Sequence, residues 1–123
     1  MPRLRALQDK EIEVMAINYG WEKFHLAVLS LASGSGSIQS RLANVFVSSL
    51  KRVEPSKDLP PELQAEFASI LQEMTSVQPK GKEGSLAASA QAMSTERASE
   101  IAERIVSMYD TIVRQDELQK HKS

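Results

Sequence analysis

The spacing in this sequence that comes nearest to a ligand motif is Glu22-x-x-His25. Two residues three positions apart lie on the same side of a helix, so a carboxylate and an imidazole can reach one metal ion. Di-iron sites in helical bundles use such a pair twice, with two further inward carboxylates. The only other histidine, His121, has no acid three positions before it, and a mononuclear site would need Glu66 or Glu100. Glu22 and His25 are therefore metal candidates without a complete ligand set, and the alternative is a histidine hydrogen-bonded locally in the core.

A second pairing lies near the C-terminus, where Arg114 and His121 enclose six residues. This spacing resembles the Arg-x(4–6)-His signature of the HEPN nucleases, and the resemblance covers these two residues and the helical character of the chain. It implies a helical bundle that carries the pair on a late helix and cleaves RNA as a dimer. The same residues also fit a solvated, charged tail, because Lys120 and Lys122 flank the histidine.

Other catalytic sets are incomplete. The chain has no cysteine and no Gly-x-Ser-x-Gly elbow, so nucleophilic catalysis lacks its usual parts. The segment 34–37 (Gly-Ser-Gly-Ser) precedes a predicted helix and could hold an anion at its N-terminus. It lacks the lysine of a phosphate-binding loop and follows a helix rather than a strand, so we interpret it as a helix–helix connection. We expect no bound cofactor or metal, and a protein that is not an enzyme.

The net charge argues against a protein that mainly binds nucleic acid, because the chain has 15 Lys and Arg residues against 16 Asp and Glu. A helix-turn-helix over residues 21–53 is the alternative, since Gln39 and Arg41 begin its second helix and can read base edges. Arg41 also has a simpler interpretation. Its stem would cover the core while its head pairs with Glu100 or Asp110.

Glycine and proline divide the 123 residues into helical segments. Hydrophobic periodicity predicts helices over 21–33, 38 to about 53, 61 to about 77, and from 95 onward. Residues 9–19 are ambiguous between helix and strand, and we favour a helix that either breaks at Gly20 or continues with apolar residues on two sides. Residues 85–93 form either a short helix or a flexible strap.

Caps and apolar faces refine these elements. Gly34 is expected to end the first strong helix in a left-handed conformation, and Ser35 or Ser37 to cap the next. Ser94 or Thr95 should cap the last helix, whose broad apolar face predicts a central position. One face of the first helix is predicted to be apolar, and it comprises Trp21, Phe24, His25, Val28, Leu29 and Ala32.

The sequence thus predicts one all-α domain over 1–123, a compact, mostly antiparallel bundle of four to five helices. It has a long loop around 78–93 and frayed tails at 1–8 and 119–123. The indicated function is a non-enzymatic protein-interaction or regulatory module, cytoplasmic, without a membrane, and quite possibly a homodimer. The alternatives are a nucleic-acid-binding regulator using residues 21–53 and, third, a metal-dependent or HEPN-like RNA-processing enzyme. The residues expected to contact a partner or ligand are Trp21, His25, Arg41, Arg52 and Tyr109.

Overall fold

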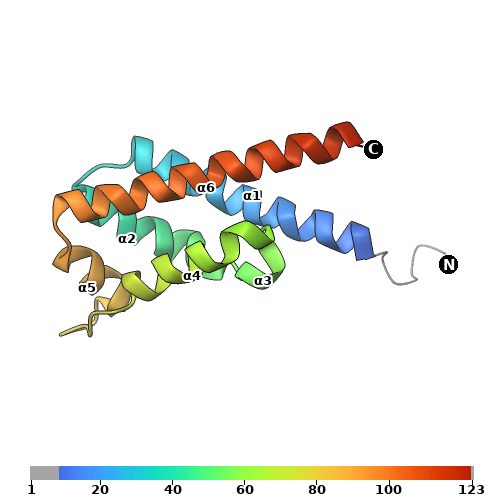
Figure 1. Cartoon of the computed structure of the whole chain (residues 1–123). Coiled ribbons are helices and arrows are strands. Elements are labelled where there is room, and N and C mark those ends of the chain that lie inside the picture. The colour runs from blue at the N-terminus through green and yellow to red at the C-terminus, as the bar shows by residue number, and fades with distance from the viewer. Residues whose placement is uncertain (1–8, 123) are drawn as a thin grey trace.

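Helices make up most of the computed structural model, which describes the backbone of residues 9–122 and the side chains of residues 18–118 (Figure 1). Their order is α1 (Asp9–Ser33), α2 (Ile38–Ser48), the 3₁₀ turn η2 (Leu50–Arg52), α3 (Pro55–Asp58), α4 (Pro61–Met74), α5 (Gly84–Ala92) and α6 (Thr95–Lys122). The predicted all-α bundle is confirmed, because α1, α2, α4 and α6 run in alternating directions along one axis. The predicted tail at 1–8 and residue 123 lie outside the described residues, and the backbone of 119–122 continues α6.

Helix α1 passes through Gly20 without interruption, so the predicted segments 9–19 and 21–33 are one helix. A break at Gly20 is wrong, and the helix with apolar residues on two sides is the alternative that holds. A glycine is needed here because the neighbouring backbone is close: a Cβ at this position would lie 2.3 Å from the carbonyl oxygen of Asp58. Gly20 therefore lets α3 pack directly on the backbone of α1.

Two prolines mark where the helices between residues 54 and 74 begin. Pro55 and Pro61 each occupy the first turn of a helix, where the missing N–H leaves no hydrogen bond unmade. The stretch between the helix predicted to end near 53 and the helix predicted to begin at 61 contains the single turn α3. The turn is held by the buried carboxylate of Asp58, whose Oδ2 accepts a hydrogen bond of 2.8 Å from the backbone N–H of Glu54. This bond compensates part of the cost of burying a charged group.

The connection between α1 and α2 differs from the prediction in its glycines. The left-handed residue is Gly36, with φ of 89°, and not Gly34. Gly34 closes α1 differently, since its N–H donates to the carbonyl of Ser30 at 2.9 Å. Ser37 caps α2 as predicted, because its hydroxyl accepts from the N–H of Ser40 at 3.0 Å.

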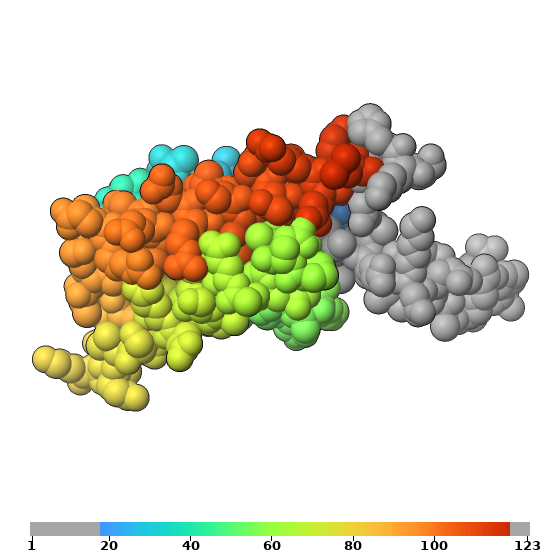
Figure 2. Space-filling model, viewed as in Figure 1, coloured from blue at the N-terminus to red at the C-terminus, as the bar shows by residue number. Residues whose placement is uncertain are grey.

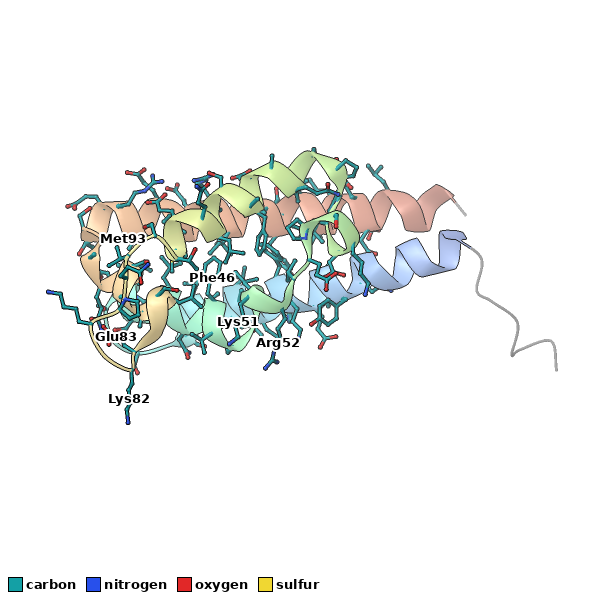
Figure 3. All side chains as sticks on the ribbon, turned by 90° about the horizontal axis from the view of Figure 1, so that it is seen from below. Phe46, Lys51, Arg52, Lys82, Glu83 and Met93 are labelled. Carbon is teal, nitrogen blue, oxygen red and sulfur yellow. The ribbon has the colours of Figure 1, made fainter. Side chains whose placement is uncertain are left out.

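Helix α2 ends at Ser48, earlier than the predicted end near Val53. The chain tightens into η2 and reaches Val53 and Glu54 in extended conformation. The residue before a proline is restricted to extended conformations, so a helix cannot continue through Glu54. Figure 3 shows the result: Lys51 and Arg52 point outward, whereas Phe46 points into the interior.

The predicted long loop around 78–93 is wrong in its second half, which forms α5. Its small side chains let it lie close to α2, and Ala90 is fully buried. The buried hydroxyl of Ser89 accepts a hydrogen bond of 3.0 Å from the N–H of Val77, which fixes the segment after α4. Only the turn before α5 extends away from the bundle, with Lys82 and Glu83 at its tip (Figure 3).

Three phenylalanines join the helices in the core. Phe67 of α4 lies with its ring centroid 5.8 Å from that of Phe24 of α1 and 6.5 Å from that of Phe46 of α2. Helix α6 packs against both α1 and α2 along one face, which is narrower than predicted because Val106 is 45% exposed. Its buried face is regular and consists of Ala98, Ile101, Ile105, Met108 and Ile112. None of the described helices is both long and apolar enough to cross a bilayer.

Candidate functional site

Three of the five residues predicted to contact a partner or ligand meet between α1 and α6. The indole of Trp21 stacks on the imidazole of His25, with centroids 5.0 Å apart and planes at 5°. Nδ1 of His25 shares a hydrogen bond of 3.0 Å with the hydroxyl of Tyr109. The rings of Trp21 and Tyr109 are 6.4 Å apart, so each member touches the other two. We call these half-buried residues the aromatic cluster.

The aromatic cluster explains how His25 is held. Nδ1 is engaged by a tyrosine and one ring face is covered by an indole, which together orient the imidazole. Glu22 lies exposed on the same helix. Within the described side chains, no three histidine, aspartate or glutamate residues gather as metal ligands would. The position of His25 therefore fits a packing and hydrogen-bonding role between two helices.

An apolar groove continues from the aromatic cluster toward the end of the bundle where α6 begins. It has a volume of about 380 Å³ and is lined by Val28, Leu31, Ala32, Ile38, Ser99, Ala102, Glu103 and Val106. We call it the α1–α6 groove. Its walls carry alanines at Ala32 and Ala102, and its one charged lining residue is Glu103. From Trp21 to Ala32 the apolar surface on α1 is about 16 Å long, a span that suits a few turns of a helix.

Large exposed apolar side chains lie in and near this groove: Val106 lines it, Leu29 lies three residues before its Ala32, and Leu26 lies further round the outer face of α1. Leu29 is 50% exposed, Leu26 is 41% exposed, and Val106 is 45% exposed. The two leucines share the outer face of α1, because they are three residues apart. The side of α1 that enters the core is a different one and consists of Phe24, Ala27 and Leu31. Of the predicted apolar face, Phe24 alone enters the core, whereas Leu29 and Ala32 are exposed.

Leu26 was not predicted as a contact residue and Leu29 was assigned to the apolar face, because apolar residues occur on every side of α1, mixed on the outer side with Glu22, Lys23 and Ser30. Trp21 and Val28 face α6 while Leu26 and Leu29 face outward, so periodicity alone could not show which side is covered. The available signal was the excess of apolar positions over what one buried face requires. A helix that is apolar on all sides is normally buried on all sides.

Arg41, the fourth residue predicted to contact a partner or ligand, instead forms a hydrogen bond at the C-terminal end of α1. Its Nη1 donates a hydrogen bond of 2.6 Å to the carbonyl of Leu31, one of the groups that a helix C-terminus leaves without a partner. The predicted pairing with Glu100 or Asp110 is wrong, since Glu100 binds Arg97 and Asp110 binds Arg114. The Arg41 side chain thus lies across the turn that joins α1 to α2.

The remaining predicted residues do not join the aromatic cluster. Arg52 lies exposed in η2, apart from α6 (Figure 3). Gln39 is engaged inside the fold, because its amide donates to the carbonyl of Met93 at 3.2 Å and to the hydroxyl of Thr95 at 3.3 Å. Arg114 pairs with Asp110 at 3.0 Å, and the side chain of His121 lies outside the described part of the chain.

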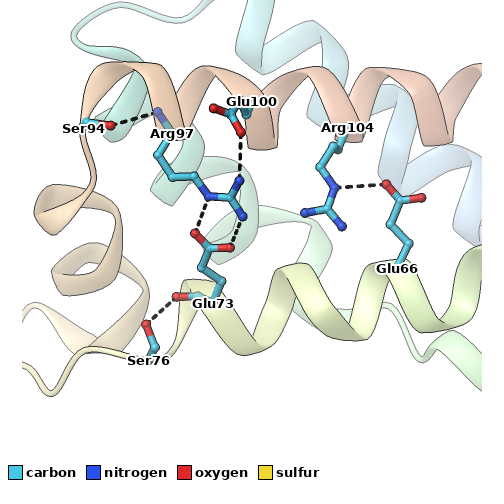
Figure 4. A network of polar contacts seen from close by, with 7 residues as sticks. All are labelled: Glu66, Glu73, Ser76, Ser94, Arg97, Glu100 and Arg104. Carbon is cyan, nitrogen blue, oxygen red and sulfur yellow. Dashed lines mark hydrogen bonds and ion pairs between the residues drawn. The ribbon is translucent and has the colours of Figure 1, made fainter.

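The opposite flank of α6 faces α4, which lies beside it on the surface in Figure 2, and ion pairs join the two helices (Figure 4). There α4 and α6 lie side by side, and Nε of Arg97 donates to Oε2 of Glu73 at 2.6 Å. Nη2 of Arg97 binds the other oxygen of the same carboxylate, which makes the pair bidentate, and Nη1 reaches Glu100 at 2.9 Å. Two turns further, Arg104 binds Glu66 at 3.2 Å. Ion pairs thus join α6 to α4 on this flank, whereas the flank of α6 toward α1 is apolar.

Hydrogen bonds from Arg97 lower the pKa of Glu73 below its ordinary value of 4.5. Partial burial opposes this shift, while the charges of Arg97 and Arg104 add to it. A carboxylate whose pKa is lower in the folded state stabilises the fold above the unfolded pKa, and the contribution is lost as the pH falls through the folded pKa. The side chains of Arg97 and Glu73 are 38% and 32% exposed, so solvent screens the pair.

Glu73→Gln is accordingly expected to cost less than about 1 kcal/mol at neutral pH and to reduce the acid-induced loss of stability below about pH 4.5. Urea denaturation at a series of pH values measures both effects. Arg97→Met should reduce the same pH dependence, and the double variant should reduce it no further, because both changes remove one interaction. Strictly additive losses in the double variant would show that the pair is not the origin of the effect.

Comparisons of the chain with protein-family models, with curated proteins and with solved structures gave no match.

Proposed function

We propose that the protein is a non-enzymatic protein-interaction module, acting in the cytoplasm, whose binding surface is the α1–α6 groove together with Leu26 and Leu29. The observation that carries this proposal is the exposure of Val106 in the groove and of Leu29 beside it. Single exposed apolar residues need no explanation, but several that border a groove mark a surface that a partner covers. Covering the exposed half of Leu29 would contribute up to about 1 kcal/mol.

The shape of the surface favours a helical partner. The groove runs along the line where α1 and α6 meet, and Ala32 and Ala102 leave room for a side chain from a third helix. Amphipathic helices bind such grooves through residues spaced three or four positions apart. The aromatic cluster fixes the spacing of α1 and α6 at one end of the groove, because Trp21, His25 and Tyr109 hold the two helices together there.

The interactions of Gln39 and Arg41 also favour this function over nucleic-acid binding. In a helix-turn-helix protein these two side chains would need to reach base edges. Here Gln39 binds residues before and at the start of α6, and Arg41 binds the end of α1. Their hydrogen-bonding groups thus serve contacts between helices.

Photo-crosslinking in living cells tests the proposal. A benzoylphenylalanine at position 29 is expected to form an adduct with one defined protein, which mass spectrometry identifies from both crosslinked peptides. The matched control carries the same group at Val47, which is 46% exposed on α2. Adducts at position 47 equal to those at 29, or none at position 29, would contradict the assigned surface.

A further inference from the structure

Acidic residues recur at seven-residue intervals along α6, which carries Glu96, Glu103, Asp110 and Glu117. All four side chains are exposed. Seven residues span nearly two turns of a helix, so the four lie along one side of α6, about 10.5 Å apart. Glu103 lines the α1–α6 groove, and the others continue this edge in both directions. We call these four residues the acidic line.

The chain itself neutralises the acidic line only in part. Asp110 pairs with Arg114, but the two side chains are 59% and 77% exposed, so solvent weakens the pair. Arg97 and Arg104 of the same helix bind carboxylates of α4 on the other flank. None of the residues that line the groove is basic. The edge of the groove on α6 therefore presents negative charge to whatever binds there.

The groove beside the acidic line is apolar. Ala102 and Val106 contribute to its wall on α6, and Val28 and Ala32 to its wall on α1. Leu29, half exposed, adds apolar surface next to the wall on α1. An occupant therefore meets apolar atoms along its centre and carboxylates along one edge. In paired helices, the same arrangement places apolar residues at the seam and charged residues beside it, both with a period of seven.

We propose, resting on the proposed function, that the partner is a basic amphipathic helix of another protein, with a seven-residue repeat. Its apolar residues, three and four positions apart, pack over Ala32, Ala102 and Val106. Its lysines or arginines, seven positions apart on the side toward α6, face the acidic line. Charges placed in this way determine the choice of partner and the register more than the affinity.

Charge also argues against two other occupants of the groove. An acidic helix or a fatty acid would bring a carboxylate to Glu103, and like charges placed together at an interface oppose binding. A second copy of this chain lacks a suitable helix. Within the described helices, Arg97 and Arg104 are the basic residues seven positions apart, and both are engaged by α4.

Two synthetic peptides test the charge preference. Each is three heptads long with leucine at the two seam positions, and the flanking positions carry lysine in one peptide and glutamate in the other. Titration with the full chain, followed by fluorescence anisotropy at low salt, should show at least about tenfold tighter binding of the lysine peptide. Added salt should reduce this preference. Equal affinities, or no binding of the lysine peptide, would overturn the inference.

Glu103→Lys locates the contact. It is expected to weaken binding of the lysine peptide about tenfold and to tighten binding of the glutamate peptide, because it converts an attraction into a repulsion and the reverse. Glu62→Lys makes the same change in net charge at an exposed position of α4 and should alter either affinity less than about twofold. Equal effects of the two variants would mean that the peptides respond to net charge alone, and would overturn the inference.

The photo-crosslink at position 29 separates this inference from the proposed function. We expect the crosslinked segment of the partner to carry basic residues seven positions apart, and Glu103→Lys to reduce the adduct. A defined partner whose crosslinked segment is acidic, or a second copy of this chain, would overturn the basic helix and leave the proposed function standing. Absence of any adduct at position 29 would overturn both.

Discussion

Truncation of Phe67 to alanine is expected to lower the free energy of unfolding by about 3–5 kcal/mol. Phe67 is 1% exposed and contacts Phe24 and Phe46, so one ring joins α4 to both α1 and α2. Its loss removes apolar burial and leaves a cavity that three helices border. Thermal unfolding followed by circular dichroism should show a midpoint lower by roughly 10–20 °C.

The control for this variant is Phe67→Leu, which keeps much of the side-chain volume and should cost clearly less than the alanine variant. Both must be compared at one chain concentration, since self-association would add a concentration-dependent term to stability. Equal losses for leucine and alanine would mean that the site depends on the aromatic ring itself rather than on filled volume.

Gly20→Ala is expected to destabilise the protein by about 1–3 kcal/mol, although alanine is the better helix former by about 1 kcal/mol. The added methyl group would lie 2.3 Å from the carbonyl oxygen of Asp58 and 3.3 Å from its carbonyl carbon. Both are backbone atoms, so relief requires α1 and α3 to separate. That movement exposes part of Leu59, which is 4% exposed in the native fold.

Fluorescence of Trp21, the only tryptophan in the chain, reports this change directly, because Trp21 follows Gly20. We expect an altered emission spectrum together with a lower urea midpoint. Glu22→Ala places an alanine at an exposed position of α1, where helix propensity changes by well under about 1 kcal/mol, and should be close to neutral. An increase in stability for Gly20→Ala would show that the contact with Asp58 relaxes at little cost.

Much of the fold could be predicted from the sequence because its signals are local. Pro55 and Pro61 permit helices to begin but not to continue through them, and a serine at Ser37 or Ser94 supplies a cap. The helix at Gly20 and α5 could not be assigned on that basis. In both cases the deciding interaction is with a segment far away in the sequence, α3 for Gly20 and α2 for α5.

The candidate site was predicted in part for the same reason. Trp21 and His25 share one side of a helix, which spacing shows, but their contact with Tyr109 requires the antiparallel pairing of α1 and α6. The exposure of Leu26 and Leu29 was not predicted, because periodicity reveals which residues of a helix are apolar without revealing which side the rest of the chain covers. Arg41 was predicted to form an ion pair with a carboxylate, yet its guanidinium donates a hydrogen bond to a backbone carbonyl at the end of α1.

The two flanks of α6 respond to the solvent in opposite ways. Dissolved ions screen the partly exposed pairs of Arg97 with Glu73 and of Arg104 with Glu66, so higher ionic strength weakens the attachment of α4. Sulfate and similar salts strengthen apolar burial, and hence the attachment of α1 on the other flank. The type of salt therefore changes the relative strength of the contacts that α6 makes with α4 and with α1.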